Sequence, residues 1–243
     1  MGIIILHNKI FKIIISTIVI CLLALLYLAA SKRLNRIFIK KYSVYGIDVS
    51  HYQGKINWQM LKEQETGFAY IKATEGSSHT DKKFLKNWEH VQLTGIIAGA
   101  YHFFSFDSPA SSQAEHFIET VGSLSGKLVP MVDVEYYADK EKNPPDKEQT
   151  IAQLQEFLHI LEAEYNKKPV IYTTYKVYHR YIKGRFKQYP LWIRNVYYPP
   201  FDIDGGWQIW QYSDIGKTEG INSSVDLDVF SGTKEEFAQF IVP

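Results

Sequence analysis

The stretch LVPMVDVE, residues 128–135, is an almost wholly apolar run that ends in two carboxylates at alternate positions, Asp133 and Glu135. Such a run is typical of a buried strand, and because side chains alternate along a strand, both carboxylates would point to the same side. Their Cα atoms would lie about 6.6–6.8 Å apart. Neighbouring carboxylates repel, and burial raises the pKa of the one that protonates more readily. One group can therefore remain an acid at neutral pH while the other stays ionised.

Charge divides the chain near Lys41. Every charged residue before that point is basic, namely Lys9, Lys12, Lys32, Arg33, Arg36, Lys40 and Lys41. The whole chain has 27 basic and 26 acidic residues, so the part after Lys41 has 20 against 26 and a net charge of −6. An acidic domain lacks the basic surface that nucleic-acid binding requires. We therefore expect no nucleic-acid partner.

Residues 13–30, IIISTIVICLLALLYLAA, form an uncharged run of 18 residues inside a basic leader that covers residues 1–41. This length suits a bilayer span of about 17–25 residues and exceeds the ~7–15 of a signal-peptide core. We expect an uncleaved signal anchor; a signal peptide cleaved near residues 29–31 is the alternative. Basic residues flank both ends, so the sequence leaves the orientation open. Cys21, the only cysteine, lies within the run and leaves none for a disulfide in the rest of the chain.

After residue 42, short β-rich runs alternate with amphipathic stretches. We expect strands at 44–49, 68–74, 96–104, 128–135 and 170–174, each followed by a helix. Asp146 is the expected N-cap of the longest of these helices. Three further strands, at 191–193, 207–212 and 225–229, are joined by loops. Five β/α units followed by three strands predict one α/β barrel domain, residues 42–243, with its site at the carboxyl ends of the strands.

Polar and aromatic residues gather at these strand ends. They are Asp48, Glu75, Tyr101, His102, Asp133, Glu135, Tyr172, Trp192, Trp210, Gln211, Tyr212 and Asp226. Each has a structural explanation when taken alone, such as a turn cap, a solvated loop or a core aromatic. Their common position at one end of a barrel indicates a cleft. Carboxylates beside Tyr and Trp suit a sugar polymer, because aromatic faces pack on pyranose rings.

Six motifs carry a resemblance to a known family. They are GIDVS at 46–50, IKATEG at 71–76, GAYHF at 99–103, DVE at 133–135, WQY at 210–212 and VDLDVF at 225–230. In this order they resemble glycoside hydrolase family 25, the Chalaropsis-type lysozymes, over residues 44–232. The resemblance implies a flattened TIM-like (β/α)5β3 barrel. It also implies cleavage of the β-1,4 bond from N-acetylmuramic acid to N-acetylglucosamine in peptidoglycan, and so a domain that acts outside the cytoplasm.

The resemblance also assigns roles to residues. Glu135 matches the general acid, Asp133 its partner carboxylate, and Asp48 and Asp226 the two further acids. The resemblance places Tyr101, Trp210, Gln211 and Tyr212 in the glycan groove. From their positions at strand ends, we expect Glu75, Tyr172 and Trp192 in the same groove. In the expected mechanism Glu135 protonates the glycosidic oxygen, while Asp133 stabilises the positive charge on the sugar or orients the N-acetyl group of the substrate. Direct inversion by water is the alternative, so the stereochemistry stays open.

Two positions depart from the family pattern. Arg194 stands where the family has Ala after W-I, and VDLD replaces the more usual V-D-x-N, which makes Asp228 an alternative to Asp226.

Two other classes of function compete with the hydrolase. One is a peptidoglycan-binding pseudoenzyme with the same groove. The other is a metal hydrolase that uses Asp48, His51, His102 and Asp133, but no histidine pair at ligand spacing supports it. We expect no cofactor or metal, a monomer, and partners limited to glycan strands and the membrane.

Overall fold

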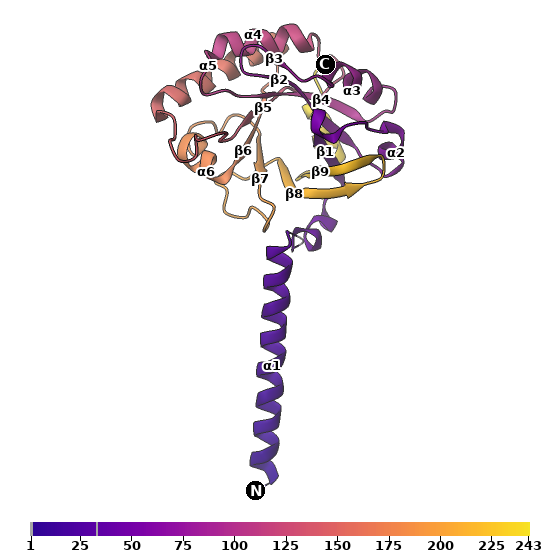
Figure 1. Cartoon of the computed structure of the whole chain (residues 1–243), viewed down its shortest axis with the longest axis vertical. Helices are drawn as coiled ribbons and strands as arrows, with labels where there is room; N and C mark the ends of the chain where they lie inside the picture. Colours follow the sequence, from indigo (N-terminus) through magenta and orange to yellow (C-terminus); the bar gives the residue numbers. More distant parts are fainter. Residues whose placement is uncertain (1, 33) are drawn as a thin grey trace.

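Eight strands close into one barrel within residues 2–32 and 34–243, which are the residues that the computed structural model describes (Figure 1). For residues 2–8 and 29 this description covers the backbone alone. The strands are β1 (Val44–Val49), β2 (Phe68–Glu75), β4 (Ile97–Phe103), β5 (Met131–Val134), β6 (Val170–Thr174), β7 (Leu191–Arg194), β8 (Ile209–Thr218) and β9 (Ile221–Phe230). The short strand β3 (His79–Thr80) pairs with the outer edge of β2.

The order around the barrel is β1, β9, β8, β7, β6, β5, β4 and β2, and pairing of β1 with β2 closes the ring. Seven of these described strands run parallel, and β9 runs antiparallel to both β8 and β1. The carboxyl ends of the seven parallel strands therefore meet at one end of the barrel. That end is where a site is expected.

Helices follow the first five parallel strands. They are α2 (Trp58–Glu63), α3 (Phe84–Val91), α4 (Ala110–Val121), α5 (Lys147–Tyr165) and α6 (Tyr175–Val177), which continues into η4 (Tyr178–Ile182). A one-turn 3-10 helix, η3 (His51–Gln53), precedes α2. Asp146 caps α5 as predicted, since its side chain accepts the backbone N–H of Gln149. The predicted sequence of five β/α units followed by three strands is confirmed.

Strand β5 is shorter than the predicted strand 128–135. Pro130 has no N–H for the sheet, and the two residues before it pair elsewhere. Leu128 bridges to Ile241, and the N–H of Val129 donates to the carbonyl of Phe240. The strand therefore begins at Met131. It ends at Val134, and Glu135 is the first residue beyond it.

Strands β8 and β9 are longer than predicted and form a hairpin that extends past the barrel (Figure 1). Thr218 pairs with Ile221 across a two-residue turn. Gly220 in this turn has φ +94°, and a Cβ there would lie 2.8 Å from the carbonyl oxygen of Asn57. The hairpin therefore depends on glycine at this position.

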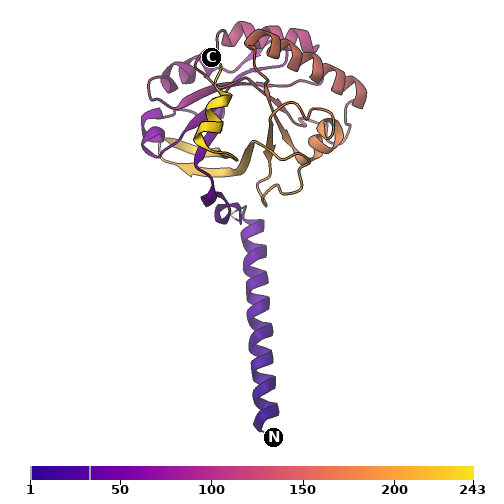
Figure 2. The same cartoon turned by 180° about the vertical axis from the view of Figure 1, so that it is seen from behind.

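The end of the barrel that holds the amino ends of the strands is plugged by the C-terminal segment. Helices α7 (Lys234–Phe237) and η5 (Ala238–Phe240) lie across that end (Figure 2). The ring of Phe237 packs against those of Phe68 and Phe230, with centroid distances of 5.1 Å in both cases. Figure 1 shows the opposite end, across which these two helices do not lie.

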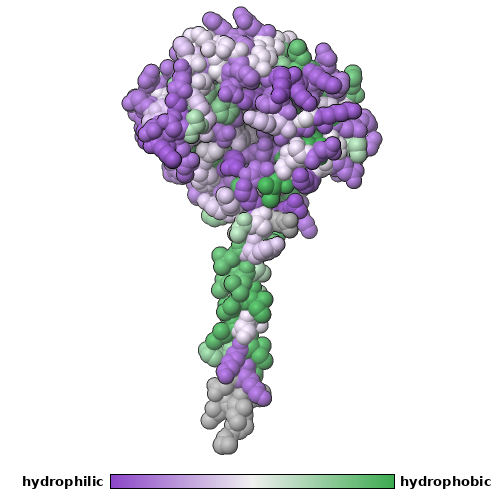
Figure 3. Space-filling view, viewed as in Figure 1, coloured by the Kyte–Doolittle hydropathy of each residue, from purple (hydrophilic) through white to green (hydrophobic). Residues whose placement is uncertain are grey.

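Helix α1 (Gly2–Ala30) projects from the side of the barrel, next to β7 and β8 (Figures 1 and 2). Its segment Lys9–Leu28 is long and apolar enough to cross a membrane, and no part of it is buried against the barrel. Figure 3 shows its hydrophobic surface below a largely hydrophilic barrel. A signal sequence near the start of a chain has the same features.

Candidate active site

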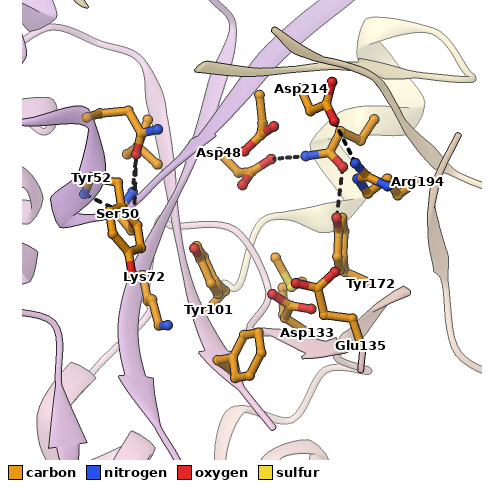
Figure 4. A pocket seen from close by; sticks show the side chains of 16 residues that line it. Asp48, Ser50, Tyr52, Lys72, Tyr101, Asp133, Glu135, Tyr172, Arg194 and Asp214 are labelled. Atoms are coloured by element: carbon orange, nitrogen blue, oxygen red, sulfur yellow. Dashed lines mark hydrogen bonds and ion pairs between the residues drawn. The ribbon is translucent and has the colours of Figure 1, made fainter. Parts of the chain in front are cut away.

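A pocket of about 460 Å³ lies at the carboxyl ends of the barrel strands (Figure 4). Five carboxylates line it: Asp48, Asp133, Glu135, Asp214 and Asp226. They come from four barrel strands, with Asp133 on β5 and Glu135 directly after it, so closure of the barrel brings them together. The lining also contains two cationic side chains, Lys72 and Arg194.

Three hydrogen-bonded side chains fix one wall of the pocket. Asp48 on β1 accepts a hydrogen bond from the Gln211 amide (Nε2 to Oδ2, 3.1 Å), and the Gln211 Oε1 accepts one from the Tyr172 hydroxyl at 2.8 Å (Figure 4). These contacts orient the amide and join β1, β8 and β6. Asp226 lies directly opposite Asp48 in the antiparallel pairing of β9 with β1.

Asp133 and Glu135 lie side by side at the end of β5 (Figure 4). Burial raises the pKa of Asp133, and the charges of Glu135 and Asp48 raise it further. Burial also raises the pKa of Glu135, while Arg194 and Lys72 oppose the rise. Because two close carboxylates in a buried site resist joint ionisation, the fold favours a proton on one member of the pair.

The other carboxyls of the cluster are shifted in the same direction. Burial and the charge of Asp226 raise the pKa of Asp48. Burial and the charge of Asp214 raise the pKa of Asp226 to about 7. Such a pocket can donate a proton from one carboxyl group while another stabilises positive charge, which is the arrangement that acid–base chemistry at a glycosidic bond requires.

Two tyrosines in the pocket serve as neutral donors. Burial, followed by the surrounding carboxylates, raises the pKa of both Tyr101 and Tyr172. Both hydroxyls therefore keep their protons. The structure places these two residues and Gln211 in the pocket wall.

Four residues expected in the groove lie elsewhere. Trp192 and Trp210 are fully buried, and Tyr212 is 6% exposed. Trp192 packs between Tyr70 and Tyr172, while the Trp210 indole donates to the carbonyl of Asn195 at 2.8 Å. Glu75 faces a separate cavity. Trp192 fills the barrel interior, as large rings do in so small a barrel. Trp210 alternates with the pocket-lining Gln211 and packs against Trp207 and Tyr212 on the other side of β8.

The structure separates Asp226 from its alternative, Asp228. Asp226 lines the pocket, whereas Asp228 is fully buried on the same strand and is absent from the lining. Neither carboxylate oxygen of Asp228 has a hydrogen-bond partner among the described residues. Burial and the charges of Asp48 and Asp226 raise its pKa.

The histidines of the metal-hydrolase alternative do not converge on the pocket. His102 is fully buried behind it, between Thr74 and Gln113, and burial lowers its pKa to about 3. His51 binds Asp81, with 2.7 Å between Nδ1 and Oδ2. Among the described residues, no group of three His, Cys, Asp or Glu side chains is arranged to hold a metal ion.

Sequence reasoning missed two charged residues of the pocket, Asp214 and Lys72. Asp214 lies three positions after Gln211, so strict alternation would place the two on opposite faces. A bulge between Gln211 and Ser213 shifts the register of β8 and returns Asp214 to the pocket side. The sequence could have indicated Lys72, because a lysine inside the apolar strand β2 is rarely buried without a role.

A second cavity of about 350 Å³ adjoins the pocket, and Arg194 lines both. Four tyrosines line the second cavity: Tyr136, Tyr175, Tyr197 and Tyr198. Lys176 and Glu141 form an ion pair at its edge. The open end of the barrel therefore continues from an acidic pocket into an aromatic one.

Known proteins are similar to this chain in sequence and in fold. The family described as Glycosyl hydrolases family 25 matches residues 47–221. The chain is 39% identical to the protein YegX of Escherichia coli O157:H7, over 82% of this chain and 74% of that one. It is 33% identical to Lysozyme M1 of Streptomyces globisporus, over 78% and 68% of the two chains. The solved structure of a family 25 glycosyl hydrolase from Bacillus anthracis superposes with a TM-score of 0.80 at 43% identity, over 83% and 94%. The chain therefore belongs to glycosyl hydrolases family 25 and is a glycoside hydrolase.

Proposed function

We propose that this glycoside hydrolase is a muramidase that cleaves the β-1,4 bond between N-acetylmuramic acid and N-acetylglucosamine in peptidoglycan. The observation that carries the proposal is the acid cluster at the open barrel end, with Asp133 and Glu135 side by side in it. Relatives support the substrate: two are named Lysozyme M1 and Autolytic lysozyme, at 33% and 32% identity.

In this proposal Glu135 is the general acid. It is the more exposed member of the pair, and it gives its proton to the glycosidic oxygen as the bond to the anomeric carbon breaks. Asp133 is ionised in the reactive form, where the nearby charge of Lys72 offsets part of the effect of burial, and it stabilises the positive charge that develops on the sugar. A water molecule supplies the hydroxyl of the new reducing end, and its proton returns to a carboxylate of the cluster.

Asp48 and Asp226 are the proposed acceptors of that proton. They face each other across β1 and β9, and the Gln211 amide holds Asp48 in place. The stereochemistry of the product identifies the attacking group. A retained anomeric configuration indicates participation by the N-acetyl group of the substrate, with Asp133 orienting it; an inverted configuration indicates direct attack by water. Proton NMR of the first product formed distinguishes the two.

Sugar units next to the cleaved bond have two proposed binding surfaces. Tyr101 and Tyr172 offer hydroxyl donors inside the pocket. The adjoining cavity offers tyrosine faces on which pyranose rings can pack. An extended glycan strand that crosses both cavities would pass Arg194.

Replacement of Glu135 by Gln tests the assignment. The amide keeps the shape of the side chain but has no acidic proton, so we expect a loss of at least about 100-fold in the release of reducing ends from purified peptidoglycan. Glu156→Gln, on the exposed face of α5, is the matched control and should retain full activity.

A Glu135→Gln enzyme with wild-type activity would refute the proposed acid. Wild-type protein that binds peptidoglycan and releases no reducing ends would instead indicate the pseudoenzyme.

We also propose that α1 anchors the barrel outside the cytoplasm. The exposed apolar segment Lys9–Leu28 supports an anchor, and a peptidoglycan substrate requires the outer location.

A further inference from the structure

The linker between α1 and β1 lies on the barrel rather than free of it. It contains two short 3-10 helices, η1 (Leu34–Ile37) and η2 (Ile39–Lys41). Asn35 in η1 is 1% exposed, and its amide nitrogen donates to the carbonyls of Asn195 and Tyr212, at 2.9 Å in both cases. A polar side chain buried in this way fixes the linker against the ends of β7 and β8.

Aromatic contacts hold the second half of the linker. The ring of Tyr42 packs edge-on against Trp207 and Trp210, with centroid distances of 5.7 and 6.4 Å. The hydroxyl of Tyr45 on β1 donates to the carbonyl of Ile39 at 3.0 Å. The linker is thus bound at both ends, and its first residues lie beside the open end of the barrel.

Lys32 reaches from this linker to a carboxylate of the active-site pocket. Its Nζ lies 2.7 Å from Oδ2 of Asp214. The same oxygen is 2.6 Å from a guanidinium nitrogen of Arg194. Asp214 therefore bridges two cations, one from the barrel and one from the linker. All three side chains are at least two-thirds buried, where ion pairs are screened less than at the surface.

The charges of Lys32, Asp214 and Arg194 also affect the pKa values of the acids in the pocket. Arg194 is the largest of the influences that oppose the raised pKa of Glu135. Asp226 faces charges from every surrounding element: Asp48 on β1, Glu135 after β5, Arg194 on β7, Asp214 on β8, Asp228 on β9 and Lys32 in the linker. The charge of Lys32 opposes the rise in the pKa of Asp226.

We propose that Lys32 is a positioning residue of the active site, which holds Asp214 and through it the Arg194 guanidinium, so that docking of the membrane-proximal linker completes the pocket. This inference rests on the proposed function, because it concerns control of the same site. The contact lies after α1 and after residues 29–31, where a signal peptide would be cleaved. Lys32 therefore stays in the chain whether α1 is retained or removed.

Three variants of the full chain in detergent test the proposal: Lys32→Gln, Lys32→Arg and Lys40→Gln. Lys32→Gln removes the charge from Asp214, and we expect about a fivefold loss in the rate of peptidoglycan cleavage. Its pH–rate profile should move to higher pH, because loss of a nearby positive charge raises the pKa of the carboxyls. Lys32→Arg keeps the charge and should restore both rate and profile. Lys40 is exposed in the same linker and forms no ion pair among the described residues, so Lys40→Gln should match wild type.

A double-mutant cycle shows whether Lys32 acts through Asp214. Added to Asp214→Asn, Lys32→Gln should cause no further shift of the profile, since its partner charge is already gone. A further shift of the same size as in wild type would overturn the proposed route.

The proposal and the proposed function fail in different ways. Wild-type cleavage with an unchanged rate and profile in Lys32→Gln refutes the role of Lys32 and leaves the muramidase intact. Absence of wild-type cleavage refutes the muramidase, and carboxyl ¹³C NMR titration then decides the inference without a substrate. In that titration the midpoint of Asp226 should be higher in Lys32→Gln than in wild type, and an equal midpoint refutes the role of Lys32.

Discussion

Asp228 shows how the environment of one residue determines its charge. The carboxyl is fully buried, has no hydrogen-bond partner among the described residues, and lies near two other carboxylates. Ionisation in such a place is costly, so the folded state favours the protonated form. The sequence pattern left Asp226 and Asp228 as alternatives, because both lie on the same side of β9. The depth of each in the barrel decides which one borders the pocket, and this depth follows from pairing with β1 and β8.

Asp228→Asn should therefore stabilise the protein at alkaline pH. The pKa of Asp228 is raised on folding, so its contribution to stability is full below the unfolded pKa near 4 and is lost as pH rises through the folded pKa. The variant cannot ionise, and we expect a gain of about 1–3 kcal/mol at pH 8, with a smaller difference at pH 5. Thermal unfolding at the two pH values measures both.

The exposed carboxylate Glu119 on α4 provides the control. Glu119→Gln should change stability little at either pH. A gain for Asp228→Asn that is equal at pH 5 and pH 8 would show that ionisation of Asp228 is not its cause.

At the scale of elements, periodicity predicted most of the strands and failed where the chain leaves regular geometry. The β/α alternation gave the five helical units, because each helix has a cap or an apolar face that can be seen locally, as with Asp146. The bulge in β8 is not visible in the pattern, so Asp214 was missed. The docking of η1 was missed for another reason. Asn35 binds residues 160 and 177 positions away, and no local pattern encodes such a contact.

Asn35→Ala should release this linker from the barrel. The substitution leaves two carbonyls without their buried donor, which costs about 1–3 kcal/mol. The linker contains five trypsin sites, which are Lys32, Arg33, Arg36, Lys40 and Lys41. Limited trypsin digestion of the folded protein should cut there faster in the variant, as read by mass spectrometry of the fragments.

Asn143→Ala, at an exposed position, is the control for that digestion. Equal cleavage of the linker in wild type and Asn35→Ala would show that the amide does not hold it.

At the scale of the whole molecule, composition predicted a basic leader and an acidic domain, and the motifs predicted the barrel. Orientation in a membrane could not be predicted, because basic residues flank both sides of the apolar run. The active-site end of the barrel faces sideways from α1 (Figure 1). The direction in which the active-site end faces does not follow from local sequence, and neither does the C-terminal plug at the other end. Both depend on how the barrel closes.

Protease treatment of intact cells tests the proposed location. With an outward-facing domain, protease added to cells whose outer layers have been made permeable should remove the barrel and leave α1 with the membrane fraction. A cytoplasmic control protein should stay intact in the same sample. Protection of the barrel until the cytoplasmic membrane is broken would contradict the outward location.

If α1 anchors the barrel as proposed, the docked linker also determines how the enzyme can reach its substrate. A flexible linker would let the barrel reorient freely above the membrane, so that the opening of the active-site pocket could point in any direction. A linker bound through Asn35, Tyr42 and Lys32 removes most of that freedom. With α1 upright in a bilayer, the remaining motions are spin about the helix axis and lateral drift. The opening of the pocket then stays at one height above the membrane as the protein rotates. At that height it is accessible to glycan strands that run parallel to the membrane.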